Sequence, residues 1–223
     1  MLTVHHLENS RSQRVLWLLE ELEVPYEMVR YARDPQTMLA PESLKAVHPL
    51  GKSPVITDDG EAIAETGAIL EYILERHGGG RLAPPTGTAE HRRLRYWLHY
   101  AEGSAMPPLL LKLIFSELSP RAPALVRPLV NMIAKTAQQS FIDPQLKLHF
   151  DYWEGELAKS AWFAGDDFSA ADIMMSFPVE AAAERAGLRL GRPRLAAFLK
   201  AIHQRPAYRR ALERGGPYAY AAD

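Results

Sequence analysis

Hydrophobic residues recur with a helical period in the stretch "LENSRSQRVLWLLEEL", residues 7–22. The spacing i, i+3, i+4, i+7 places side chains on one buried face of an α-helix, and it is followed by Val15, Leu18, Leu19 and Leu22. A polar cluster comes just before them, formed by Asn9, Ser10 and Ser12. Because the cluster lies where the helix would begin, its side chains can cap the helix, take part in chemistry, or do both.

The pattern around this helix predicts a small mixed sheet with helices packed against it. Strands are expected at residues 1–7 and 26–31, and a hairpin over residues 53–65 with its turn at Asp58-Asp59-Gly60. Residues 41–48 favour a short helix. Residues 66–78 favour a longer helix with Ile69, Leu70, Ile73 and Leu74 facing inward and Gly78 at its C-cap. The order β-α-β-α-β-β-α is typical of an α/β domain.

Beyond this region the chain changes character. Residues 78–90 are dense in Gly and Pro, which indicates a linker, and no convincing strand follows. A long helix is expected from Thr88 or Ala89, kinked or broken at Pro107 and Pro108, with a second kink or restart at Pro144. We therefore expect an α/β domain at residues 1–80, a linker at 81–88 and an all-helical domain at 89–223.

Composition narrows the range of partners. The chain has 223 residues, 47% of them hydrophobic and 24% charged, and its net charge of −1 gives no reason to expect nucleic acid or a membrane as partner. No run reaches transmembrane length and no signal-peptide pattern is present, so a cytoplasmic location is the default expectation. Cysteine is absent. Any thiol chemistry must therefore use a thiol that arrives with a ligand.

Two motifs in the first domain suggest a binding site. In "HPLGKSPVI", residues 48–56, Pro49 and Gly51 form a turn, and Ser53-Pro54 leads into a strand through a bond that can be cis. In "AETGAILEYI", residues 64–73, Thr66 is the expected N-cap with Glu65 just outside. The same hydroxyl, carboxylate and helix N-terminus could instead bind a zwitterion.

A third motif has a structural interpretation. In "FSAADIMM", residues 168–175, Ser169 and Asp172 have the spacing of a capping box. Phe168 and Ile173 form the hydrophobic staple around it. We expect this motif to begin a helix.

Taken together, "SRSQRVLWLLEEL", "HPLGKSPVI", "ETGAILEYI" and "FSAADIMMSFP" resemble a cytosolic glutathione S-transferase of a bacterial, serine-like type. Their order and intervals match along essentially the whole chain. The resemblance implies an α/β plus all-α fold, in which a thioredoxin-like N-terminal domain precedes an all-helical domain, usually in a homodimer. It also implies glutathione as cosubstrate and no metal.

The resemblance places glutathione on the N-terminal domain. The backbone of Ser53 would pair with its cysteinyl part, and Pro54 would be the cis-proline that shapes this edge. Glu65 and Thr66 would hold the γ-glutamyl end. Lys52 would lie near the glycyl carboxylate.

The expected mechanism depends on the pKa of the glutathione thiol. A free thiol has a pKa near 8.5, and lowering it by ~2 units requires ~2.7 kcal/mol of preferential stabilisation of the thiolate. A hydroxyl hydrogen bond and the positive end of the first helix can provide this. The family uses tyrosine, cysteine or serine, but no tyrosine lies between residues 5 and 14 and the chain has no cysteine. Ser10 is the favoured donor, with Asn9 and Ser12 as alternatives.

The remaining expectations concern the second substrate. Tyr100 or Met106 is expected near a pocket for a hydrophobic electrophile between the domains. His5 and His6 have no metal-ligand spacing and are expected to be edge or core residues. The predicted function is glutathione transfer to such electrophiles, extended by peroxidase activity. The alternatives are a glutathione-dependent lyase, isomerase or dehalogenase of a catabolic pathway, or a non-catalytic ligand-binding relative.

Overall fold

A four-stranded mixed sheet organises the N-terminal part of the protein. The computed structural model describes residues 1–188 and 191–221. The strands are β1 (Thr3–Leu7), β2 (Glu27–Tyr31), β3 (Val55–Asp58) and β4 (Glu61–Ala64), in the order β2-β1-β3-β4. β1 is parallel to β2 and antiparallel to β3, and β4 completes a hairpin with β3. The helices of this part are α1 (Ser12–Leu22), α2 (Glu42–Lys45) and α3 (Thr66–His77), which confirms the predicted order.

Helix α1 is buried on more sides than the single apolar face that its sequence pattern predicts. Val15, Leu18, Leu19 and Leu22 are buried as predicted, but so are Gln13 and Arg14. The reason is that α1 packs against β1 and α3 on the sheet side and against α8 and α10 of the helical part. Residues far apart in the sequence therefore enclose α1 from several directions.

The hairpin turn and the following helix α3 are present as predicted, but the N-cap of α3 is a different residue. Asp59 and Gly60 have φ angles of 49° and 87°, the conformation that a type I′ turn requires at both central positions. Thr66, predicted as the N-cap of α3, is instead its first residue. The N-cap position is occupied by Glu65, which has a φ of 71° and makes no side-chain capping bond. The hydroxyl of Thr66 faces inward and accepts a hydrogen bond from Arg14.

The helical part begins at α4, where the Thr88 side chain accepts a hydrogen bond from the His91 N–H. Its elements are α4 (Ala89–Tyr100), the π-helical segment η1 (Ala101–Ala105), α5 (Met106–Arg121), α6 (Arg127–Ala137), η2 (Gln138–Ile142), α7 (Asp143–Leu157), α8 (Ala170–Arg185), α9 (Pro193–His203) and α10 (Pro206–Gly215). The residues between His77 and Ala89 form no helix or strand.

Both predicted disruptions are present as π-helical segments. η1 ends just before Pro107 and η2 just before Pro144. A proline has no N–H to donate to the carbonyl four residues earlier, and its ring crowds that carbonyl. The wider π-helical turn accommodates the missing hydrogen bond and the proline ring, so the helical path continues into the next helix.

The capping box of α8 is present as predicted. The hydroxyl of Ser169 accepts a hydrogen bond from the Ala171 N–H at 3.3 Å. The Asp172 carboxyl accepts hydrogen bonds from the Ser169 N–H at 2.9 Å and the Phe163 N–H at 2.8 Å. The box therefore also fixes the loop that precedes α8.

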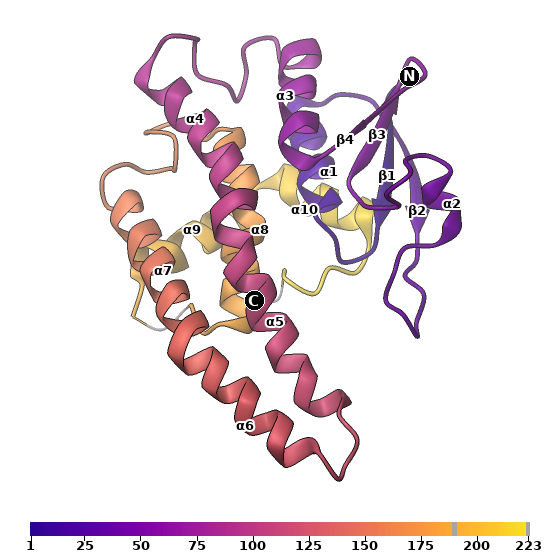
Figure 1. Ribbon diagram of the computed structural model, residues 1–223. Helices are drawn as coiled ribbons and strands as arrows, with labels where there is room; N and C mark the ends of the chain where they lie inside the picture. Colours follow the sequence, from indigo (N-terminus) through magenta and orange to yellow (C-terminus); the bar gives the residue numbers. More distant parts are fainter. Residues whose placement is uncertain (189–190, 222–223) are drawn as a thin grey trace.

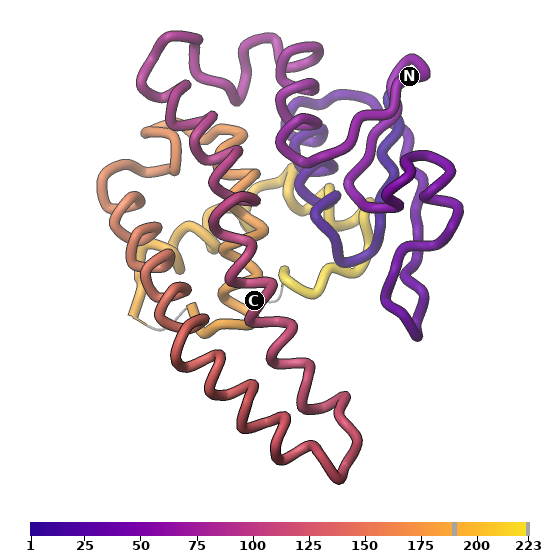
Figure 2. Tube along the Cα trace, in the orientation of Figure 1, coloured from indigo at the N-terminus to yellow at the C-terminus, as the bar shows by residue number. Residues whose placement is uncertain are grey.

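The N-terminal part and the helical part stand side by side, and the C-terminal end of the chain returns to the N-terminal part (Figures 1 and 2). Helices α5 and α6 form a hairpin that projects away from the rest of the molecule (Figure 1). Helix α10, drawn in yellow, packs against α1 beside the sheet. Among the helices that the structure describes, none combines the length and apolar character needed to cross a membrane.

Candidate functional site

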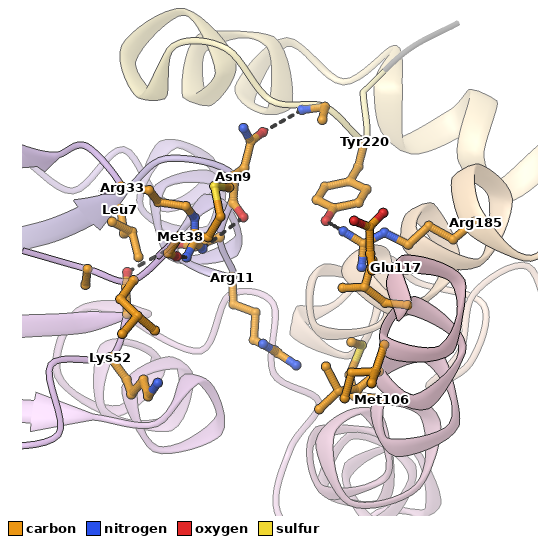
Figure 3. A pocket seen from close by; sticks show the side chains of 18 of the residues that line it. Leu7, Asn9, Arg11, Arg33, Met38, Lys52, Met106, Glu117, Arg185 and Tyr220 are labelled. Atoms are coloured by element: carbon orange, nitrogen blue, oxygen red, sulfur yellow. Dashed lines mark hydrogen bonds between the residues drawn. The ribbon is translucent and has the colours of Figure 1, made fainter. Parts of the chain in front are cut away.

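A cleft of about 1160 Å³ opens between the N-terminal part and the helical part. Figure 3 shows the two walls facing each other, with Arg11 directed into the space between them. The N-terminal wall includes Asn9, Ser10, Arg33, Lys52 and Ser53. The helical wall includes Met106, Leu110, Ile114, Glu117, Phe177, Arg185 and Tyr220.

Ser10 is the hydroxyl at the centre of the N-terminal wall. Its Oγ accepts a hydrogen bond from the Ser12 N–H at 3.2 Å, which anchors it to the first turn of α1. The same Oγ lies 2.7 Å from Ser12 Oγ and 3.3 Å from Ser53 Oγ. Ser10 thus joins the start of α1 to the loop before β3. Ser10 is also close to the positive end of the helix dipole, which favours an anion in the cleft.

The two alternatives to Ser10 are placed differently. Ser12 is fully buried and its Oγ lies 2.8 Å from His6 Nδ1, so it faces the interior and does not line the cleft. Asn9 lines the cleft, but its Oδ1 accepts a hydrogen bond from the Ala219 N–H at 2.8 Å. Asn9 therefore ties the C-terminal segment, residues 216–221, to the loop before α1.

The two histidines of β1 are buried, in agreement with the core interpretation. His6 interacts with Ser12, and burial together with the nearby Arg30 lowers its pKa to about 4. His5 Nδ1 lies 2.9 Å from the Tyr31 hydroxyl, and burial lowers the pKa of His5. Both imidazoles are therefore neutral at neutral pH. Across the described residues, no cluster of His, Asp and Glu side chains could hold a metal ion.

The loop before β3 contributes the rest of the N-terminal wall. The Ser53–Pro54 bond is cis, and the Ser53 hydroxyl donates a hydrogen bond to the His5 carbonyl at 3.2 Å. Gly51 has a φ of 56°, a conformation that favours glycine. Lys52 is exposed and reaches the rim of the cleft (Figure 3).

Glu65 and Thr66 lie outside the set of residues that lines this cleft. Glu65 is exposed at the N-terminus of α3, while Thr66 is buried and joined to Arg14. Together they form the N-terminal end of α3.

An ion-pair cluster under the cleft was not foreseen from the sequence. Arg14 is fully buried and donates hydrogen bonds to the Met174 carbonyl at 2.8 Å and to Glu102 at 2.5 Å. Arg11 donates to the same carboxylate at 3.0 Å. Burial would raise the pKa of Glu102, but the two guanidinium groups lower it overall. Two cations share one carboxylate, so the cluster carries a net positive charge, and Arg11 brings it to the lining of the cleft.

Of the two residues predicted near the electrophile pocket, Met106 lines the cleft and Tyr100 does not. Met106 lines the cleft on the helical wall (Figure 3). Tyr100 is not among the described residues that line it: its hydroxyl accepts a hydrogen bond from Trp153 at 2.9 Å and also contacts His149. The helical wall also contains residues that were not predicted to lie there, among them Phe177, Arg185 and Tyr220. Phe177 belongs to the motif at residues 168–178, but only the packing of α8 and the C-terminal segment brings these three residues to the cleft.

The sheet order, the cis-proline before β3 and the following helical bundle define a thioredoxin-like domain joined to an all-helical domain. Comparisons with known proteins agree. The family described as "Glutathione S-transferase, N-terminal domain" matches residues 1–75, and "Glutathione S-transferase, C-terminal domain" matches residues 118–206. The chain belongs to the glutathione S-transferase family, whose members are transferases.

Similar proteins cover nearly the whole chain. Glutathione S-transferase 3 of Schizosaccharomyces pombe is 33% identical over 96% of this chain and 88% of its own. Glutathione S-transferase 1 of Saccharomyces cerevisiae is 35% identical over 83% of this chain and 82% of its own. A glutathione S-transferase crystal structure from Actinobacillus pleuropneumoniae has a TM-score of 0.83 and 30% identity, covering 100% of this chain and 97% of that one. A sphingomonad glutathione S-transferase complexed with glutathione has a TM-score of 0.72 and 26% identity, covering 96% and 98%.

Proposed function

We propose that this protein binds glutathione along the N-terminal wall of the cleft and joins its sulfur to a hydrophobic electrophile held by the helical wall. The observation that carries the proposal is the position of Ser10, whose hydroxyl lines the cleft at the N-terminal end of α1. The sphingomonad relative with bound glutathione supports the choice of cosubstrate.

Ser10 is proposed as the donor to the glutathione sulfur. When the Ser12 hydroxyl donates to Ser10 Oγ across their 2.7 Å contact, the proton of Ser10 is free to point into the cleft. A hydrogen bond to the thiolate then stabilises it over the thiol, and the positive end of α1 and the Arg11–Arg14–Glu102 cluster act in the same direction. The thiol proton leaves to solvent, the thiolate sulfur forms a bond to the electrophilic carbon, and the leaving group departs with its electron pair. Because glutathione itself is the nucleophile, the protein forms no covalent intermediate.

The other glutathione contacts follow from the residues around Ser10. The Ser53 backbone before cis-Pro54 would pair with the cysteinyl unit as an added strand does. Lys52 on the rim would meet the glycyl carboxylate. Glu65 is exposed at the N-terminus of α3, where its carboxylate can receive the γ-glutamyl ammonium. Thr66 already accepts a hydrogen bond from Arg14, so its own proton remains available for the γ-glutamyl carboxylate.

A glutathione affinity column and an assay with an aromatic halide test this function together. Retention, elution by free glutathione and enzyme-dependent conjugation are the expected results. Retention without conjugation would favour the ligand-binding alternative, and failure to bind glutathione would exclude the transferase, the lyase, the isomerase and the dehalogenase alike. Peroxidase activity is tested separately with an organic hydroperoxide, whose reduction consumes two glutathione molecules.

A homodimer and a cytoplasmic location remain predictions of the family resemblance, as does the division of the chain at residues 80 and 89. The α5–α6 hairpin supports self-association, because it exposes Leu125, Leu129, Met132 and Ile133. Such a set of exposed apolar side chains is typical of an interface. Sedimentation at several concentrations tests the dimer, and Met132→Glu should weaken it.

A further inference from the structure

The helical wall of the cleft combines apolar side chains with Arg185, an arginine that forms no ion pair with the residues that the structure describes. Its apolar lining consists of Met106, Leu110, Leu113, Ile114, Leu118, Val130 and Phe177. Arg185, at the last turn of α8, points into the same space from its far side (Figure 3). Within residues 1–188 and 191–221, no carboxylate lies within 4.0 Å of its guanidinium group.

The two carboxylates that act on Arg185 electrostatically, those of Glu117 and Glu184, form no ion pair with it. Glu117 lines the same wall, but it forms an ion pair with Arg121 at 3.2 Å. Glu184 precedes Arg185 in the chain and is exposed to solvent. Both carboxylates act on Arg185 only through longer-range electrostatics.

Tyr220 holds the arginine in place without changing its charge. Arg185 Nη2 donates a hydrogen bond to the Tyr220 hydroxyl, and the guanidinium carbon lies 4.7 Å from the centre of the ring. Burial lowers the pKa of Arg185, but an arginine remains protonated in proteins. The cleft therefore contains a half-buried, oriented cation with N–H groups directed by a neutral partner. Such a cation binds an anion more strongly than a fully solvated one does.

We propose that the electrophile is amphipathic: an apolar body that fills the helical wall, with an anionic group, a carboxylate in its simplest form, bound by Arg185. The proposal rests on the proposed transferase function and specifies its second substrate. The partners proposed above for the carboxylates of glutathione, Lys52 at the rim and Thr66 at the α3 N-terminus, both belong to the N-terminal part. Arg185 is thus available to the second substrate, while Ser10 presents the sulfur across the cleft.

A matched pair of aryl chlorides tests this inference: 4-chloro-3,5-dinitrobenzoate and its methyl ester. In both, the thiolate sulfur forms a bond to the ring carbon, the carbon–chlorine bond breaks, and chloride leaves with its electron pair. The carboxylate takes no part in the bond changes. Dividing each kcat/KM by the uncatalysed rate constant with glutathione removes the difference in intrinsic reactivity between acid and ester.

The wild-type protein is expected to favour the acid over the ester by roughly tenfold in this normalised ratio, the effect of one charge-assisted hydrogen-bonded pair. Arg185→Met should reduce the ratio by about the same factor, and Arg185→Lys should restore part of it because the charge returns. Arg95→Met is the matched control, because Arg95 is an exposed arginine of α4 outside the cleft. Its acid-to-ester ratio should equal that of the wild type.

Two outcomes overturn the inference. A wild-type ratio near one would show that the cleft does not favour an anionic electrophile. An unchanged ratio in Arg185→Met with a higher KM for glutathione would assign Arg185 to glutathione instead. The ionisation of bound glutathione, followed by thiolate absorbance in the same variants, separates this failure from failure of the transferase function. If the wild type forms no bound thiolate, the proposed function fails. If it forms the thiolate without favouring the acid, only the anionic electrophile is wrong.

Discussion

Ser10 Oγ lies 2.7 Å from Ser12 Oγ, so the hydroxyl that lines the cleft is held by one that is fully buried. The Ser12 N–H also donates to Ser10. A side chain with two internal contacts is fixed before a ligand arrives. Such preorganisation is what a donor to a developing anion requires, because no reorientation is needed during the reaction.

Ser10→Ala should raise the pKa of bound glutathione and slow conjugation. A hydrogen bond to a charged group is worth about 1.5–3 kcal/mol, so the thiol pKa should rise by about one to two units and turnover at neutral pH should fall by about 10- to 100-fold. Thiolate absorbance against pH, with and without enzyme, measures the first effect. Asn9→Ala is the matched control from the same loop, and an equal or larger pKa change in that variant would assign the donor role to Asn9.

Glu65→Ala should weaken glutathione binding without changing the pH dependence of turnover. Its carboxylate is exposed at the N-terminus of α3, outside the contacts of Ser10. Loss of a charge-assisted contact should raise the KM for glutathione by roughly tenfold. Glu61→Ala, which alters an exposed carboxylate of β4, provides the control. A shifted pH profile with an unchanged KM would contradict the role proposed for Glu65.

Protonation of His6 should destabilise the fold as the pH falls. Burial and Arg30 lower its pKa from 6.5 to about 4, so folding favours the neutral imidazole. The stabilisation is complete above pH 6.5 and is lost as the pH falls from 6.5 through about 4. Linkage puts this loss at about 3 kcal/mol.

Denaturant unfolding of the wild type and His6→Asn between pH 7 and pH 4 measures the difference. The variant should lose less stability over this range, and the comparison cancels the carboxylates that titrate in both proteins. His99→Asn changes an exposed histidine of α4 and should retain the wild-type slope. Equal slopes in wild type and His6→Asn would show that His6 does not contribute.

Glu102→Ala should be strongly destabilising because it leaves Arg14 charged and buried. Arg14 is 1% exposed, whereas Glu102 is 30% exposed and is also paired with Arg11. Removing one partner of a buried ion pair costs about 3–5 kcal/mol. The double variant Arg14→Met/Glu102→Ala should recover part of this loss in denaturant unfolding. Strict additivity of the two single changes would contradict the pairing argument.

Local patterns were sufficient for much of the fold. The hydrophobic period of residues 15–22 defines α1. Asp59-Gly60 supplies the positive φ angles of the turn between β3 and β4. Pro107 and Pro144 each follow a π-helical segment, because a proline has no N–H to donate to a carbonyl of the preceding turn. Ser169 and Asp172 specify the start of α8. Each of these features depends on residues close together in the chain.

Tertiary packing determines which side chains line the cleft. Ser10, Lys52 and Ser53 belong to motifs visible in the sequence. The sequence favoured Ser10 but left Ser12 as an alternative, and the burial of Ser12 against His6 separates the two. The pairing of Arg14 could not be predicted, because its partner Glu102 is 88 residues away in the chain.

The sequence by itself therefore determined the order of elements, the two-part division of the expected fold and the family's motifs, because periodicity, turns and caps act over a few residues. Only the tertiary structure decided which polar side chains face the cleft. Arg185 and Tyr220 reach it from the end of α8 and from the C-terminal segment. The charge of a cleft depends on which cations lack a nearby carboxylate, and that pairing is a property of the packed chain.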